Sequence, residues 1–204
     1  GEVLVNEQGN IISTSYASKI QNQFISLANQ GLDYKQILLQ VYGASNIDKM
    51  SCNTGSGGGC NSTGSTGPYS GWKQADPAWG NITIGNTSQT IAGVGCLATS
   101  VSMLIAKSGV PTTVDGSFNP GSFVKKLSAT GGFSGANLVW GAVSNAAPNF
   151  VYQNKVYIAG QSQSQKLSAI KNLLDQGYYV VAEVKGNTGQ HWVAVDGISG
   201  NTVL

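Results

Sequence analysis

The chain has 204 residues, of which 41% are apolar and only 10% are charged. Its net charge is +2 and its lysines are spread along the chain. This argues against nucleic acid as the main partner, because phosphate binding needs clustered positive charge. No apolar run approaches the roughly eighteen residues of a transmembrane helix, so we expect no transmembrane segment in this chain. A polar but weakly charged composition is typical of extracellular proteins.

Residues 1–51 are expected to form a helical N-terminal extension, or the remnant of a preceding domain. Alternating polarity predicts a short hairpin first, with its turn at residues 8–10. A helix that ends at Gly31 is predicted by the apolar spacing of SKIQNQFISLANQG. A second helix, which ends at Gly43, is predicted by LDYKQILLQVYG.

Residues 52–70 consist almost entirely of Gly, Ser, Thr and Asn, which predicts a flexible linker and a domain boundary. Cys52 and Cys60 flank seven small residues within it. In an oxidising compartment the two cysteines could close a small loop, whereas in a reducing cell they would remain thiols. The sequence leaves both alternatives open.

Residues 71–204 form the predicted main domain. A helix that begins at Cys96 and stops before Gly109 is predicted by CLATSVSMLIAKSG, and a second helix is predicted after Pro120. A third helix is predicted by QSQKLSAIKNLLDQG, and strands are predicted by YYVVAEVK, HWVAVDGI and TVL. Helices followed by an antiparallel sheet predict the α+β class.

Cys96 and His191 are the candidate reactive pair. Cys96 begins a predicted helix, where the partial positive charge and amide donors of a helix N-terminus favour a thiolate and an adjacent oxyanion. His191 is the only histidine of the chain and begins a predicted strand beside a Gly-rich turn. A cysteine and a histidine placed in this way fit nucleophilic thiol catalysis. For either residue alone a structural role would be the better interpretation, since buried cysteines pack as small hydrophobes and a lone histidine is commonly hydrogen-bonded within the structure.

Three segments carry a family resemblance: GWKQADPAWG, TIAGVGCLATSVSML and GQHWVAVDG, in that order. Together they resemble the secreted relatives of the double-glycine leader peptidases, a branch of the papain-like cysteine peptidases. The resemblance covers most of residues 71–204 and implies a papain-like cysteine peptidase domain. It implies Cys96 as nucleophile, His191 as base and Gln74 as donor to the oxyanion. Gln74 lies farther before the cysteine than in the leader peptidases, and Gln89 is a rival for this role.

The residue that would orient His191 stays open at this point. The family usually supplies an Asp from the strand after the histidine, and such an Asp could lie beyond Leu204. Asp196 is the local alternative, although it is five residues from His191 and would face the other side of a regular strand. Glu183, on the neighbouring predicted strand, is a weaker candidate.

Residues 18–47 carry a second resemblance, through SKIQNQFISLANQGLDYKQILLQVYGASNI. This stretch resembles the tail of the stage II sporulation protein D family, whose members cleave the glycan strands of peptidoglycan. It contains none of that family's catalytic residues. An ordinary helical extension is the alternative interpretation.

These observations lead us to expect a secreted thiol hydrolase that cleaves amide bonds by acyl transfer. The expected substrate is the peptide part of bacterial peptidoglycan, in the cell wall of a Gram-positive bacterium. The alternatives are a protein-directed cysteine protease or leader peptidase, and a catalytically silent module that binds wall or partner. We expect a monomer. We also expect no cofactor, since one histidine and separated cysteines provide no zinc ligand set.

Overall fold

The computed structural model describes residues 3–5, 11–14, 44–52, 68–186, 189–199 and 202–203. β1 (Val3–Val5) and β2 (Ile11–Thr14) pair as an antiparallel hairpin. This confirms the predicted pairing of two short strands, while the turn predicted at residues 8–10 lies outside the described residues. The two helices predicted to end at Gly31 and Gly43 lie outside the described residues.

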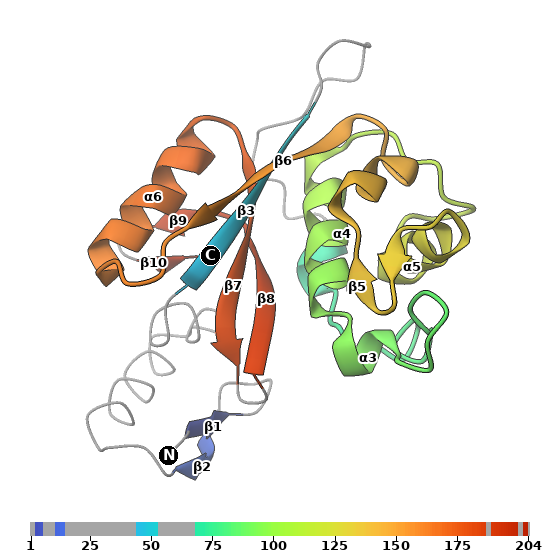
Figure 1. Cartoon of the computed structure of the whole chain (residues 1–204), viewed down its shortest axis with the longest axis horizontal. Coiled ribbons are helices and arrows are strands. Elements are labelled where there is room, and N and C mark those ends of the chain that lie inside the picture. The colour runs from blue at the N-terminus through green and yellow to red at the C-terminus, as the bar shows by residue number, and fades with distance from the viewer. Residues whose placement is uncertain are drawn as a thin grey trace.

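A four-stranded antiparallel sheet forms the middle of the molecule (Figure 1). Its strand order is β6-β3-β7-β8. The bounds are β3 (Ala44–Cys52), β6 (Phe150–Tyr157), β7 (Tyr179–Gly186) and β8 (Gly189–Val195). The predicted strands YYVVAEVK and HWVAVDGI are confirmed as β7 and β8. The mixture of helices with an antiparallel sheet is the predicted α+β class.

Helices lie on both sides of this sheet, and Figure 1 shows α6 on one side and α4 and α5 on the other. The helix bounds are α3 (Ile91–Val94), α4 (Cys96–Ser108), α5 (Pro120–Ala129) and α6 (Gln163–Asp175). Short elements complete the fold: η1 (Pro68–Gly71), β4 (Phe133–Ser134), β5 (Asn137–Leu138), η2 (Trp140–Asn145), β9 (Ile198–Ser199) and β10 (Thr202–Val203). None of the described helices is long and apolar enough to cross a membrane.

Local signals mark one boundary of each of the three main helices. α4 ends at Gly109, whose φ of 68° is the left-handed conformation that glycine adopts most readily. α5 begins after Asn119, and α6 begins after Ser162; each cap side chain accepts a hydrogen bond in a capping box. Short-range chemistry therefore determines these three boundaries.

β3 is an inner strand of the sheet, and in this the structure differs from the expected domain boundary. Residues 44–51 were expected in an extension and Cys52 in a linker, yet β3 pairs with both β6 and β7. Ile47 and Met50 are completely buried. The unit built around the sheet therefore includes Ala44–Cys52 as well as residues after the Gly/Ser-rich segment.

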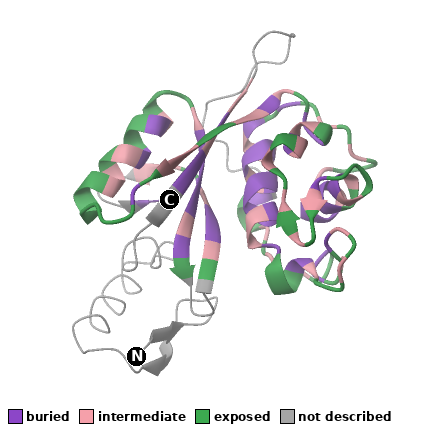
Figure 2. Cartoon of the chain, viewed as in Figure 1, coloured by how far each residue is buried: buried purple, intermediate pink, exposed green. Residues whose placement is uncertain are grey.

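The sheet separates two hydrophobic cores. The core on the α4 side contains Met50, Val181 and Trp192, together with the buried face of α4. The core on the α6 side contains alternate residues of the same strands, with Ile47 and Val193 among them. Figure 2 shows buried residues along α4 and the inner strands and exposed residues on the outer face of α6. Both faces of the sheet are thus covered.

The replacement Ile47→Ala should lower the free energy of unfolding by about 2–5 kcal/mol, the range for truncating a large aliphatic side chain in a core. Ile47 lies before the Gly/Ser-rich segment, so the loss would show that β3 belongs to the main core. Urea unfolding followed by circular dichroism measures it. Lys125→Ala, at an exposed position of α5, is the control. Equal effects of the two replacements would contradict the assignment of β3.

Candidate active site

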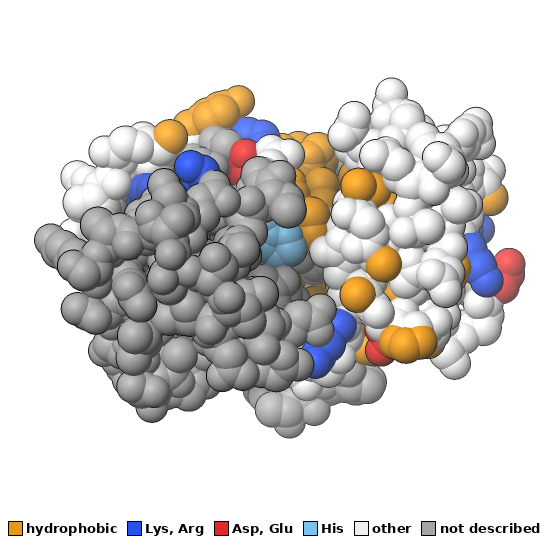
Figure 3. All heavy atoms as spheres, turned by 90° about the horizontal axis from the view of Figure 1, so that it is seen from below, with side chains coloured by type: hydrophobic (Ala, Val, Ile, Leu, Met, Phe, Trp, Pro, Cys, Tyr) orange, Lys and Arg blue, Asp and Glu red, His pale blue; other side chains and the backbone are white. Residues whose placement is uncertain are grey.

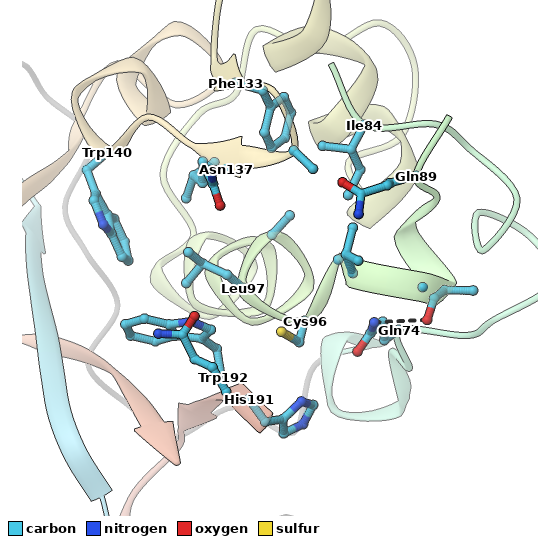
Figure 4. A pocket seen from close by; sticks show the side chains of 18 residues that line it. Gln74, Ile84, Gln89, Cys96, Leu97, Phe133, Asn137, Trp140, His191 and Trp192 are labelled. Carbon is cyan, nitrogen blue, oxygen red and sulfur yellow. Dashed lines mark hydrogen bonds between the residues drawn. The ribbon is translucent and has the colours of Figure 1, made fainter. Parts of the chain in front are cut away.

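A single cleft of about 850 Å³ brings together the three residues named from the sequence. Cys96, His191 and Gln74 all line it. Figure 3 shows the histidine side chain in a hollow of the surface, beside hydrophobic side chains. Figure 4 shows Cys96 and His191 at the same end of the cleft, with Gln74 beside them. The cleft lies within the size range of small-ligand and substrate sites.

Cys96 is held at the first turn of α4 by the short helix that precedes it. α3 runs almost directly into α4, and Gly95 is the only residue between them. A Cβ atom on Gly95 would lie 2.7 Å from the carbonyl oxygen of Ile91, so the close approach of the two helices requires glycine. Cys96 is half-buried and is not in a disulfide. Its position at the start of a 13-residue helix favours the thiolate.

His191 comes from β8, near the end at which this strand begins. It is paired with Val184 of β7 and is half-buried. The next residue, Trp192, belongs to the core that packs against α4. The imidazole of His191 itself lines the cleft together with Cys96, at the end of the sheet where β8 begins.

A buried hydrogen bond connects the helix of the cysteine to the strand of the histidine. The hydroxyl of Ser100 donates to the backbone carbonyl of Trp192 at 3.1 Å. Ser100 is one helical turn beyond Cys96 and is 2% exposed, and Trp192 directly follows His191. Sequence reasoning missed Ser100; its only signal was a serine one turn after the cysteine, on the same side of the helix.

Gln74 is oriented by the segment that leads into Cys96. Its side-chain Nε2 donates to the carbonyl of Ala92 at 3.0 Å. A carboxamide has two N–H donors, so the second remains available for an acceptor in the cleft. Gln89 lines the same cleft, but Figure 4 shows it away from Cys96 and next to Ile84. The geometry therefore favours Gln74 over Gln89 as a donor near the thiol.

Asp196 does not face the cleft, and the suggestion that it orients His191 is not supported. Its carboxylate forms a 2.7 Å ion pair with Lys107, which also donates to the Asp196 carbonyl. The hydroxyl of Tyr69 donates to the same carboxylate at 3.5 Å. Lys107 is in the last turn of α4, about 16 Å along the helix from Cys96. An Asp beyond Leu204 would lie outside this chain.

Glu183, the weaker candidate from the sequence, has a hydrogen-bond partner at the rim. Its carboxylate accepts a hydrogen bond of 2.7 Å from Nε2 of Gln190, and Gln190 lines the cleft. This interaction orients a cleft carboxamide next to His191.

Metal binding has no support in the described part of the chain, where no group of three or more His, Cys, Asp or Glu could hold an ion. Comparison with family models, with curated proteins and with solved structures finds no match for this chain. The interpretation of the site therefore depends on its geometry and its sequence.

Replacement of Asp196 by Asn should leave the rate at which iodoacetamide alkylates Cys96 unchanged, because the carboxylate pairs with Lys107 and not with His191. Stability should fall by about 0.2–1 kcal/mol, the range for an exposed ion pair. Mass spectrometry of the alkylated protein gives the rate, and thermal unfolding gives the stability. A tenfold change in the alkylation rate would instead show that Asp196 acts on the reactive pair.

Proposed function

We propose that this protein is a thiol hydrolase with a papain-like domain, which cleaves amide bonds by acyl transfer. The observation that carries the proposal is the cleft that Cys96, at the N-terminus of α4, lines together with His191 and Gln74. Nucleophilic thiol catalysis needs an activated cysteine, a base within reach and donors for the oxyanion.

The reaction proceeds in two stages. His191 accepts the proton of the Cys96 thiol, and the thiolate attacks the carbonyl carbon of the amide. Nε2 of Gln74 donates to the oxygen on which negative charge develops. As the C–N bond breaks, His191 gives its proton to the leaving amine and a thioester remains on Cys96. Water then attacks the thioester, His191 takes the proton of the water, and the acid is released with the thiol restored.

The polar lining of the cleft supports a peptide as substrate. Carboxamide side chains line it at four positions, and each can both donate and accept a hydrogen bond, as a peptide backbone does. These residues are Gln74, Gln89, Asn137 and Gln190.

A secreted protein that acts on peptidoglycan peptides is the form of this function that we propose. Cys52 is disulfide-bonded, which supports an oxidising compartment outside the cytosol. The low fraction of charged residues and the resemblance of residues 18–47 to a wall-cleaving family support the bacterial wall as the place of action.

Incubation of the wild type and of Cys96→Ala with purified wall sacculi and with casein tests this proposal. Mass spectrometry should find new amino termini on wall peptides with the wild type only, because the variant lacks the nucleophile. Cleavage of casein with an intact wall would indicate a protein-directed protease instead. Binding to sacculi without cleavage of either substrate would contradict the hydrolase and favour a binding module.

Ser100→Ala should lower both kcat and the rate of Cys96 alkylation about tenfold or more, since a small misplacement of reacting groups is costly. The control is Ser102→Ala. Ser102 is also buried in α4, but its hydroxyl donates to the carbonyl of Thr99 within the same helix. Alkylation rates across pH report the Cys96–His191 pair, and urea unfolding reports stability. Equal alkylation profiles for the two variants would show that Ser100 has only a structural role.

A further inference from the structure

A buried carboxylate lies close to one wall of the cleft and is not explained by the reaction. Asp48 of β3 is completely buried. Its oxygens accept hydrogen bonds from the Tyr152 hydroxyl at 2.9 Å and from Nζ of Lys155 at 3.3 Å. Burial raises the pKa of the Asp48 carboxyl, and the two donors oppose this shift. Burial and Asp48 also raise the pKa of Tyr152, so the phenol stays protonated and donates.

A β-bulge allows both donors to reach this carboxylate. Tyr152 and Lys155 are three residues apart in β6, so on a regular strand they would face opposite sides of the sheet. The register between β3 and β6 skips Gln153, which shifts the alternation by one residue. Both side chains therefore lie on the α4 side, together with Asp48.

Two tryptophans connect the two donors and close a ring of contacts. The Tyr152 ring stacks on Trp140 with centroids 4.6 Å apart and planes at 21°. Nζ of Lys155 lies 4.9 Å from the centroid of the Trp192 ring. Trp140 and Trp192 meet edge to face at 6.2 Å. We call these five residues, Asp48, Tyr152, Trp140, Trp192 and Lys155, the Asp48 ring.

The Asp48 ring forms part of the cleft wall. Trp140 and Trp192 both line the cleft, and Figure 4 shows them on one side of it with Leu97 nearby. Trp192 is also the residue after His191 and accepts the hydrogen bond from Ser100. An indole held on several sides presents a rigid apolar surface next to the reactive pair.

The charges around this wall indicate what it can bind. The positive charge of Lys155 is already paired with Asp48. Among the described residues that line the cleft there is no Asp, Glu or Lys. A charged substrate group placed on the tryptophans would lose its water without gaining a counter-charge, whereas an apolar group would gain buried contact area.

We propose that Trp140 and Trp192 form a subsite for an uncharged, apolar side chain of the substrate beside the scissile amide, and that Asp48 is the positioning residue of this subsite. The placement beside a scissile bond rests on the proposed hydrolase function. Binding at the subsite can be measured without any cleavage.

Titration of the Cys96→Ala protein with blocked pentapeptides, followed by tryptophan fluorescence, tests the subsite. The peptides are Gly-Gly-X-Gly-Gly with Leu, Gly, Asp or Lys at X. The Leu peptide should bind about tenfold more tightly than the Asp or Lys peptide, at the low end of discrimination by an apolar pocket. Equal affinities of the Leu, Gly and Asp peptides would overturn the subsite.

Removal of the indole provides a second measurement. Trp140→Ala in the Cys96→Ala background should abolish the preference for the Leu peptide. Trp140→Phe keeps an aromatic ring and should keep part of this preference. It provides a second measurement if Trp140→Ala does not fold. The control is Tyr157→Ala, since Tyr157 is an aromatic residue of the same strand as Tyr152, is 75% exposed and does not line the cleft. An unchanged preference in folded Trp140→Ala would overturn the assignment.

Asp48→Asn tests the positioning role, because it preserves shape but removes the charge that pairs with Lys155. It should raise KM for the Leu substrate several-fold and leave kcat unchanged. A merely structural role would instead lower kcat and affect all substrates equally. The control is Asp175→Asn, which breaks the exposed pair with Lys171.

The two proposals can fail separately. If wild-type protein cleaves nothing while Cys96→Ala still prefers the Leu peptide, the hydrolase proposal fails and the subsite stands.

Discussion

The packing of α4 against β8 is the constraint on which the whole cleft depends. The two elements are far apart in sequence, and they carry Cys96 and His191. The bond between Ser100 and the Trp192 carbonyl lies inside this contact. A buried polar group without a partner costs roughly 1–3 kcal/mol, so a slide of α4 along the strand would leave two such groups unsatisfied. The hydrophobic core provides most of the packing energy, while this hydrogen bond selects one register.

The cleft also depends on β3, which lies before the Gly/Ser-rich segment in the sequence. As an inner strand it pairs with β6 and β7, and its side chains enter both cores. It also supplies Asp48, which accepts hydrogen bonds from Tyr152 and Lys155. These two donors contact the tryptophans of the cleft wall. The cleft is therefore built from both sides of that segment, and loss of β3 would affect the core and the cleft wall together.

The sequence predicted those features that local chemistry determines. The end of α4 at Gly109, its start at Cys96 and the start of α5 at Pro120 were predicted from neighbouring residues, and the structure adds the caps Asn119 and Ser162. β3 was missed because Asn46, Asp48 and Lys49 give it a polar character that resembles an exposed segment more than an inner strand. The Asp48 ring needs a β-bulge and contacts between distant strands, and neither leaves a periodic signal in the sequence.

The geometry of β8 also restricts how the imidazole can be oriented. Val193 and Val195 belong to the core on the α6 side. Because side chains alternate along a strand, the Cβ of His191 points to that side as well. The imidazole ring nevertheless lines the cleft, because His191 lies at the rim of the sheet. Asp196, at the other end of β8, is about 16 Å away at ~3.3 Å per residue and is held by Lys107. We therefore expect a group that orients His191 to lie near the end of the sheet where β8 begins. In this part of the sheet Glu183 accepts the hydrogen bond of Gln190, so one of the cleft carboxamides is held beside the base.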